Sequence, residues 1–477
     1  MLLTNLLKNV EKYMMIGNDI NIRHLSHCSS LCVKDTLFFA IDGTKEDGAK
    51  YVEEAIECGA IAVVTNKRLK VNIAQIIVDD VRETMSLIAK AFYHNASDKL
   101  KIIGIVGTNG KTTSSFIIKN ILTFAGFTVG VVGTNGVYID NNRISEDLTT
   151  PDPIDLHKYL DIMKKAKVDY VIMEVSAHAI DLKKIKGIRF KVGLYTNISN
   201  EHLDYFGTMK NYTKCKLSFF NNDIVDEAVY NIDDDYGVEL ARNYNVPNIT
   251  YGLDSPSNTF AIDIVESIDG TKFIVNSLDS IFKIDTKLLG KHNVYNILGA
   301  MSVCKLLNIN DKYIELGVNT IDKIDGRCNV IRVNNNYVII DFAHTPDGFE
   351  KILSTIRGVC KGKVITLFGC VGYSDTRKRS IMGNVASRYS DYIILTSDNP
   401  GDTDIKKINR DIKSGFKKYK NYIEIDDRRD AIKYGLGLLC SSDVLVLLGK
   451  GGEHKQIIMN EIFKYNEEEV VNNLING

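Results

Sequence analysis

The sequence predicts an α/β protein of three domains, each with helices packed around a mainly parallel sheet. Short apolar runs typical of buried strands alternate with helical patterns along the 477 residues. The alternation is interrupted at the polar stretch 95–98 and restarts near Asp325-Gly326-Arg327. A chain of this length has room for roughly two to four domains. We therefore expect domains over residues 1–97, 98–325 and 326–477.

The expected elements follow in that order. The first block has strands at 36–41 and 61–64 around a helix at 49–58. The second block has strands at 101–106, 128–132, 170–173 and 192–195, and the third has strands at 337–340, 364–368, 392–395 and 444–448. Strands that alternate with helices predict parallel sheets, which bind ligands at the carboxyl ends of their strands.

Composition excludes several classes of protein. Lys and Arg number 59 against 60 Asp and Glu, so no overall positive field would draw the chain to nucleic acid. No run approaches the ~20 apolar residues that span a bilayer, and the first residues do not resemble a signal peptide. Nine cysteines without CxxC pairs fit free thiols in a reducing compartment. We expect a cytoplasmic enzyme that binds neither nucleic acid nor membrane.

The segment GIVGTNGKTT at 104–113 joins the expected strand 101–106 to a helical pattern at 112–122. Backbone N–H groups and the positive end of a helix dipole at such a turn suit a phosphate chain. Lys111 would reach the terminal phosphates, and the Thr112 hydroxyl would ligate Mg²⁺. The usual loop has four residues before its Gly-Lys pair, whereas Gly107 leaves two, and an incidental lysine in a glycine-rich turn is the alternative. The pattern predicts a nucleoside triphosphate site.

Polar residues follow other expected strands. Glu174 ends the strand 170–173, where it could hold Mg²⁺ or serve as a structural partner. Asn197, His202 and Asp204 follow the next strand; a single histidine there is usually structural, but two such features beside one loop favour a hard cation. In the third block, polar segments at 341–346, 397–402 and 449–453 follow strands. Each could be an ordinary turn, and together they predict a binding rim.

These motifs, taken in order, resemble those of the Mur ligase family, and most closely its branch that completes a UDP-MurNAc-tripeptide. They are GTNGKTT at 107–113, TTPDP at 149–153, EVSAHA at 174–179, TNISNEHLDYFG at 196–207, GKHNVYN at 290–296, DGR at 325–327, DFAHTPDG at 341–348, GCVGYSDTRKRSIMG at 369–383, DNP at 398–400 and GKGGE at 449–453. The short phosphate loop is that family's form, and the ordered set spans nearly the whole chain.

The resemblance implies an N-terminal UDP-sugar-binding domain over 1–97, a central ATP-binding ligase domain over 98–325 and a C-terminal Rossmann-like domain over 326–477 that binds an amino acid. It implies that ATP phosphorylates the D-Glu carboxylate of UDP-MurNAc-L-Ala-D-Glu in peptidoglycan precursor synthesis. The amine of the amino acid then attacks the acyl phosphate, and ADP and phosphate are released. ATP and Mg²⁺ are the implied cofactors, and a monomer is the expected state.

The resemblance also assigns residues. ATP would contact Gly107, Thr108, Asn109, Gly110, Lys111, Thr112 and Thr113, with Asn296, Arg327 and Asp341 on the interdomain side. The catalytic residues would be Lys111, Glu174, His202 and Lys216, and Mg²⁺ would bind Thr112, Glu174, His202 and Lys216 as a carbamate. The UDP-MurNAc-dipeptide would contact Ser29, Thr44, Lys45, Glu46, Thr149, Thr150, Ser176 and Lys184, and the amino acid Arg377, Asp398, Asn399, Gly449 and Glu453. From sequence alone, the favoured interpretation of Lys216 is a surface lysine, and its neighbour Lys214 competes with it for the carbamylated position.

The chain departs from the family pattern near both substrates. Cys28-Ser29-Ser30 replaces Asp-Ser-Arg, and Leu182 and Lys184 replace a Gln and an Arg. Gly401 follows DNP where diaminopimelate-adding enzymes have Arg, and Ser374 replaces a second Arg, although Arg377 lies three residues on. Losing one charge-assisted contact costs roughly 1.5–3 kcal/mol. We therefore expect that diaminopimelate is not the best substrate and that lysine, ornithine or another amino acid suits the pocket as well.

Three alternatives stay open at this point. A paralogue could amidate a different carboxylate acceptor, as folylpolyglutamate and cyanophycin synthetases do. A nucleotide-driven switch is disfavoured because Asn66-Lys67-Arg68 is followed by Leu69 rather than the Asp of a guanine-reading segment. A catalytically silent UDP-sugar binder would have lost Lys111, Glu174, His202 or Lys216, and all four are present.

Overall fold

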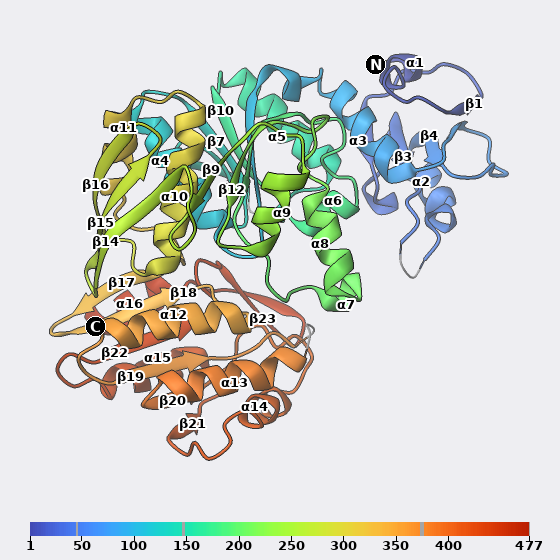
Figure 1. Cartoon of the computed structure of the whole chain (residues 1–477). Helices are drawn as coiled ribbons and strands as arrows, with labels where there is room; N and C mark the ends of the chain where they lie inside the picture. The colour runs from blue at the N-terminus through green and yellow to red at the C-terminus, as the bar shows by residue number, and fades with distance from the viewer. Residues whose placement is uncertain (44–45, 146–147, 373–375, 477) are drawn as a thin grey trace.

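The computed structural model describes residues 1–43, 46–145, 148–372 and 376–476, which form three α/β domains in chain order (Figure 1). Each of the three large sheets lies within one of the predicted blocks, which confirms the predicted fold class. The boundaries at 97 and 325 stay predictions. Thr44, Lys45 and Ser374 lie outside the described residues.

The N-terminal domain contains a five-stranded sheet of order β1-β5-β4-β3-β2, parallel except for β1. Its strands are β1 (Met14–Ile16), β2 (His24–Ser26), β3 (Thr36–Phe39), β4 (Ala60–Thr65) and β5 (Ala74–Ile77). Its helices are α1 (Leu3–Leu6), α2 (Val52–Glu57) and α3 (Val81–Phe92), with 3-10 turns at Ser29–Leu31, Gly48–Tyr51 and Ala96–Lys99. The helix expected over 49–58 thus divides into a 3-10 turn and α2. The Asp47 carboxylate accepts a hydrogen bond from the Ala49 N–H and caps that turn.

The middle domain contains an eleven-stranded sheet of order β16-β15-β14-β13-β12-β11-β6-β10-β7-β8-β9. Its strands are β6 (Lys101–Val106), β7 (Val129–Gly133), β8 (Gly136–Ile139), β9 (Asn142–Ser145), β10 (Tyr170–Glu174), β11 (Phe190–Tyr195), β12 (Val225–Asn231), β13 (Asn248–Gly252), β14 (Thr259–Ser267), β15 (Gly270–Ser277) and β16 (Ser280–Thr286). Strands from β14 to β7 in this order pair in parallel, as predicted, and antiparallel strands extend both edges.

Helices cover both faces of this sheet. They are α4 (Lys111–Phe124), α5 (Pro153–Lys165), α6 (Ala177–Asp181), α7 (Leu203–Phe206), α8 (Met209–Leu217), α9 (Asp235–Asn243), α10 (Lys291–Leu306) and α11 (Asp311–Asn319). One core joins the sheet to α4, α10 and α11, and a second joins it to α5, α8 and α9. The carboxyl end of β6, which begins the phosphate loop, therefore lies at the centre of a rigid three-layer structure.

The C-terminal domain contains a six-stranded sheet of order β17-β18-β22-β19-β20-β21, in which only the β17–β18 pair is antiparallel. Its strands are β17 (Asn329–Val333), β18 (Asn336–Asp341), β19 (Val364–Phe368), β20 (Tyr392–Leu395), β21 (Tyr422–Glu424) and β22 (Val444–Leu448), with a separate hairpin of β23 (Lys455–Ile458) and β24 (Glu461–Lys464). Its helices are α12 (Pro346–Val359), α13 (Arg377–Tyr389), α14 (Ile405–Lys413), α15 (Arg428–Gly437) and α16 (Glu467–Asn476). Because β18, β20 and β22 run parallel, the polar segments after them meet at one edge.

Polar contacts join the three domains. Between the first two, the Ser86 hydroxyl donates to the Lys183 carbonyl at 2.6 Å. Between the last two, Lys323 pairs with Glu468 at 2.7 Å. Among the described residues, none of the helices has the length and apolar character needed to cross a bilayer.

Candidate active site

The phosphate loop connects β6 to α4, as the sequence predicts. Gly110 has φ +89°, and a Cβ there would lie 2.2 Å from Oδ1 of Asn296. A Cβ on Gly107 would lie 1.8 Å from Oγ1 of Thr196. Glycine is therefore required at both positions, because the loop packs directly against neighbouring side chains. The Asn109 carbonyl also accepts a hydrogen bond from Thr196 at 2.7 Å, which anchors the loop to the residue that follows β11.

Glu174 lies at the end of β10 and is fully buried. It accepts hydrogen bonds from the Thr112 hydroxyl at 3.0 Å and from the Thr134 N–H and hydroxyl at 3.0 and 3.1 Å. Arg327 of the C-terminal domain donates to the same Thr112 hydroxyl at 3.0 Å. Glu174 and Thr112 thus present adjacent hard oxygen atoms beside the phosphate loop, a donor set that fits Mg²⁺ completed by phosphate oxygens.

Two lysines of this site have few anionic partners. The Lys111 ammonium donates to the carbonyls of Gly107 and Thr108, both at 2.8 Å. The Lys216 ammonium lies 3.4 Å from the Thr108 hydroxyl and 4.5 Å from the centre of the Tyr212 ring. Burial lowers the pKa of Lys111, and burial with the nearby Lys111 charge holds the pKa of Lys216 well below its usual range.

Glu201 links two histidines from different domains. Its carboxylate lies 3.6 Å from Nε2 of His202 and 3.7 Å from Nε2 of His344. Burial alone would raise the pKa of Glu201, but the His344 hydrogen bond and the charges of His202, His344 and Lys111 hold it well below its usual range. Burial lowers the pKa of His202. His202 and Lys216 could hold a cation together only if the lysine amine became an anionic carbamate, because an ammonium would repel the ion.

A cavity of about 440 Å³ lies between the middle and C-terminal domains. Six of the predicted ATP residues line it: Asn109, Gly110, Thr113, Asn296, Arg327 and Asp341. The Asp341 carboxylate accepts from the N–H groups of Cys328 at 2.8 Å and Ala343 at 2.7 Å. The Asn109 amide donates across the interface to Asp347 at 2.6 Å. The two domains therefore share one enclosed space beside the phosphate loop.

A second cavity, of about 490 Å³, holds all five predicted amino-acid residues: Arg377, Asp398, Asn399, Gly449 and Glu453. His202 of the middle domain also lines it. Phe342, His344 and Thr345 line both cavities, so the two spaces adjoin. Gly401, with φ +59°, pairs its backbone with residues 457–459 and is not one of the described residues lining this cavity.

The middle-domain residues predicted to hold the dipeptide gather beside Glu174. The Thr150 hydroxyl donates to the Glu174 carbonyl at 2.8 Å and accepts from the Ser176 N–H at 3.2 Å. The Thr149 and Thr134 hydroxyls lie 3.1 Å apart. The Lys184 ammonium donates to the Thr150 carbonyl at 3.4 Å.

The N-terminal domain, which contains the predicted UDP-sugar contacts, is connected to these dipeptide residues through Asp152. Lys184 pairs at 2.8 Å with Asp152, whose other oxygen is 3.9 Å from His27. The Ser29 hydroxyl donates to Glu54 at 2.7 Å, and the Tyr51 hydroxyl donates to Glu46. Asp152 therefore joins the dipeptide residues to the 24–29 segment of the N-terminal domain.

Sequence reasoning missed several residues at this site. Glu201 lies in the motif TNISNEHLDYFG and His344 in the motif DFAHTPDG. The signal that could have identified them is their position beside His202 and close to Asp341. Thr134, which donates twice to Glu174, stands in no quoted motif. Lys450, inside GKGGE, is fully buried beside Asn399 and Glu453.

A phosphate loop beside a cavity at a domain interface, adjoining a second cavity lined by both apolar and charged residues, is typical of an ATP-dependent group-transfer enzyme of three α/β domains. Family models match all three: Mur ligase family, catalytic domain at 21–93; Mur ligase middle domain at 105–304; and Mur ligase, glutamate ligase domain at 326–451. The chain belongs to the Mur ligase family, whose members form amide bonds with ATP.

Curated relatives and solved structures agree with this assignment. UDP-N-acetylmuramoyl-L-alanyl-D-glutamate–2,6-diaminopimelate ligase of Clostridium tetani is 38% identical over 100% of this chain and 99% of its own. UDP-N-acetylmuramoyl-L-alanyl-D-glutamate–2,6-diaminopimelate ligase 1 of Clostridium acetobutylicum is 37% identical over 97% of this chain and 97% of its own. A solved structure of a ligase with this name has a TM-score of 0.69, with 28% identity over 97% of each chain. MurF ligase from Thermotoga maritima in complex with ADP shares the fold, with a TM-score of 0.63 and 17% identity over 95% of this chain and 97% of its own.

Proposed function

We propose that this protein joins an amino acid to the D-Glu carboxylate of UDP-MurNAc-L-Ala-D-Glu, with ATP hydrolysed to ADP and phosphate, in peptidoglycan precursor synthesis. The observation that carries the proposal is the shared wall of the two cavities, formed by Phe342, His344 and Thr345. An ATP γ-phosphate beside the loop and an amine in the second cavity would approach one carboxylate from two sides. This is the geometry that an acyl phosphate intermediate requires.

Each group has a role in this reaction. Lys111 stabilises charge on the phosphates, and Arg327 and Asn296 orient the nucleotide from the interdomain side. Thr112 and Glu174 would hold Mg²⁺, with a second ion on His202 and carbamylated Lys216; such ions neutralise charge as the phosphoryl group transfers. Thr149, Thr150, Ser176 and Lys184 bind the dipeptide so that its D-Glu carboxylate lies beside Glu174. Ser29 and Glu46, with Thr44 and Lys45, bind the UDP-sugar.

The relatives and Gly401 point to different amino acids. The relatives' names specify 2,6-diaminopimelate, contrary to our expectation from Gly401 and Ser374. Arg377 and Lys378, at the start of α13, line the amino-acid cavity and supply positive charge for a second carboxylate. We therefore propose diaminopimelate as the substrate. Lysine is the second candidate, because Gly401 leaves no side chain at a position where Arg is expected.

The compartment and the oligomeric state complete the proposal. All nine cysteines are free thiols, which fits a reducing compartment. We propose that the protein acts in the cytoplasm as a monomer, since both cavities are formed within a single chain.

The test is phosphate release from ATP with UDP-MurNAc-L-Ala-D-Glu as acceptor and meso-diaminopimelate or lysine as the amine, with product mass measured. Release that depends on diaminopimelate supports the proposal. Release with lysine alone overturns the choice of amino acid and retains the ligase. Silence with both, while ATP still binds, favours a paralogue that amidates a different carboxylate.

A further inference from the structure

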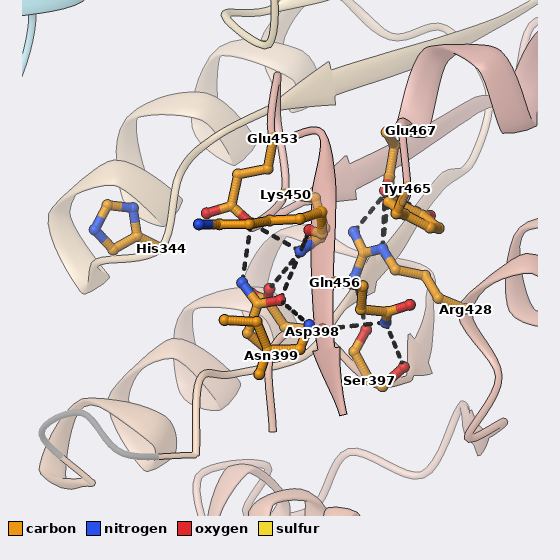
Figure 2. Close-up of polar contacts among 12 residues, drawn as sticks. His344, Ser397, Asp398, Asn399, Arg428, Lys450, Glu453, Gln456, Tyr465 and Glu467 are labelled. Carbon is orange, nitrogen blue, oxygen red and sulfur yellow. Dashed lines mark hydrogen bonds and ion pairs between the residues drawn. The ribbon is translucent and has the colours of Figure 1, made fainter. Parts of the chain in front are cut away.

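A fully buried lysine lies behind the amino-acid cavity, at the end of β22 (Figure 2). The Lys450 ammonium donates to Oδ1 of Asn399 at 2.8 Å, to Oε2 of Glu453 at 2.7 Å and to the Lys455 carbonyl at 2.7 Å. Its three N–H groups are therefore all used. The Asp398 carboxylate lies 3.8 Å away.

These contacts determine how Asn399 and Glu453 are oriented. Oδ1 of Asn399 also accepts from the Ile457 N–H at 3.0 Å, so its amide nitrogen is turned toward Glu453, to which it donates at 2.9 Å. Oε2 of Glu453 thus accepts from both Lys450 and Asn399 (Figure 2). Within the described parts of the chain, the other oxygen, Oε1, has no hydrogen-bond partner. Because Glu453 lines the cavity, Oε1 is an acceptor for a bound cation.

Lys450 also affects the electrostatics of the second cavity, because it places a positive charge beside two carboxylates. Asp398 and Glu453 are two carboxylates beside one cavity, and Lys450 lies between them. Burial raises the pKa of Asp398, and the charges of Lys450 and Arg428 offset this rise only in part. Lys450 lies 2.7 Å from Glu453 and 3.8 Å from Asp398, so its positive charge favours the ionised form of the buried Asp398 carboxyl.

A separate cluster holds the backbone at this edge of the sheet. The Arg428 guanidinium donates to the Ser397 carbonyl at 3.2 Å and the Leu448 carbonyl at 3.0 Å, and it pairs with buried Glu467 at 2.7 Å. The carboxyl ends of β20 and β22 are thus joined without Lys450. Loss of Lys450 should therefore release the side chains of Asn399 and Glu453 and the Lys455 carbonyl, and leave the ends of β20 and β22 in place.

We infer that Lys450 is a positioning residue of the amino-acid site, which holds Asn399 and Glu453 so that Glu453 receives an ammonium group of the incoming amino acid. The inference rests on the proposed function, because it assigns the second cavity to the amino acid. Lys450 itself, enclosed behind these side chains, does not contact the substrate.

The test compares Lys450→Met in the full chain with the wild type and with a matched control, Lys433→Met. Lys433 is exposed on α15 and has no polar partner among the described residues. We expect Lys450→Met to raise KM for the amino acid about ten- to a hundredfold, with KM for ATP and the thermal midpoint near the wild-type values. The control should match the wild type in all three measurements.

A double-mutant cycle shows whether Lys450 acts through Glu453. Glu453→Gln alone should also raise KM for the amino acid, and adding Lys450→Met should raise it little further. If Lys450→Met does not fold, Glu453→Gln still tests the inference, because a wild-type KM in that variant overturns it. An unchanged amino-acid KM in Lys450→Met, an equal rise in KM for ATP, or additive effects in the cycle would also overturn it. Absence of amino-acid-dependent phosphate release in the wild type would instead overturn the proposed function.

Discussion

Two pairs of enclosed cations in this molecule have opposite surroundings. In the middle domain, Lys111 contacts two backbone carbonyls, and Lys216 contacts one hydroxyl and an aromatic ring. In the C-terminal domain, Arg428 pairs with Glu467, and Lys450 pairs with Glu453 and lies near Asp398. A buried cation without a carboxylate partner is destabilising until an anion arrives. The surroundings of Lys111 and Lys216 therefore suit an anionic ligand. In the second pair, Arg428 holds the strands of its own domain together, and Lys450 orients side chains that line the second cavity.

The largest expected effect on stability concerns the buried ion pair between Arg428 and Glu467 in the C-terminal domain. Glu467→Ala removes the carboxylate of a fully buried ion pair and leaves the Arg428 charge without compensation. We expect the free energy of unfolding to fall by about 3–5 kcal/mol in urea titrations. Glu469→Ala, an exposed position on the same helix, should differ little from the wild type. A similar stability for both variants would contradict the contrast between the pairs.

The next prediction concerns Lys111 in the middle domain. Lys111→Met should lower the rate of ATP-dependent phosphate release about 10²–10³-fold, because one stabilising contact to the transferring phosphoryl group is lost. Without ATP, its free energy of unfolding should stay close to that of the wild type, because among the described residues Lys111 forms no direct ion pair with a carboxylate. Lys158→Met, on an exposed position of α5, is the matched control. A loss of stability comparable to that of Glu467→Ala would show that Lys111 is structural.

A smaller effect, on ATP binding, is expected at the interface between the middle and C-terminal domains. Asp347→Ala removes the hydrogen bond from Asn109 across the domain interface. Losing about 0.5–1.5 kcal/mol should raise KM for ATP roughly three- to tenfold. Asp347→Asn keeps a hydrogen-bond acceptor and should recover part of the loss. Equal KM values for all three proteins would mean that this contact plays no part in ATP binding.

The smallest effect belongs to an exposed ion pair. Lys272 and Asp285 lie 2.7 Å apart with 69% and 67% of their side chains exposed. Lys272→Ala should change the free energy of unfolding by less than about 1 kcal/mol, because solvent screens the pair. A loss as large as that of Glu467→Ala would show that burial does not govern the strength of these pairs.

The parts of the fold that could be predicted are those that depend on the order of residues within a short segment. Continuous apolar runs identified β6 and β22, and the glycine spacing identified the phosphate loop between β6 and α4. The strands β15 and β16 were missed because buried residues largely alternate with more exposed ones along them, and β14 was missed because most of its residues are exposed. The five predicted amino-acid residues meet in one cavity because they follow parallel strands of a single sheet.

Pairings between distant residues could not be predicted in this way. Lys450 contacts Asn399, 51 residues away, and Asn109 contacts Asp347 across 238 residues. In the sequence Lys450 is one letter between two glycines, and nothing local distinguishes a buried lysine from a solvated one. Its burial follows from the order of β20 and β22 and from the hairpin of β23 and β24, which only the folded chain defines.

The most direct test of the contrast is the dissociation constant for ATP, measured by calorimetry with the wild type, Lys111→Met and Lys450→Met. We expect weaker ATP binding in Lys111→Met alone and wild-type binding in Lys450→Met. Equal weakening in both variants, or wild-type binding in Lys111→Met, would contradict it.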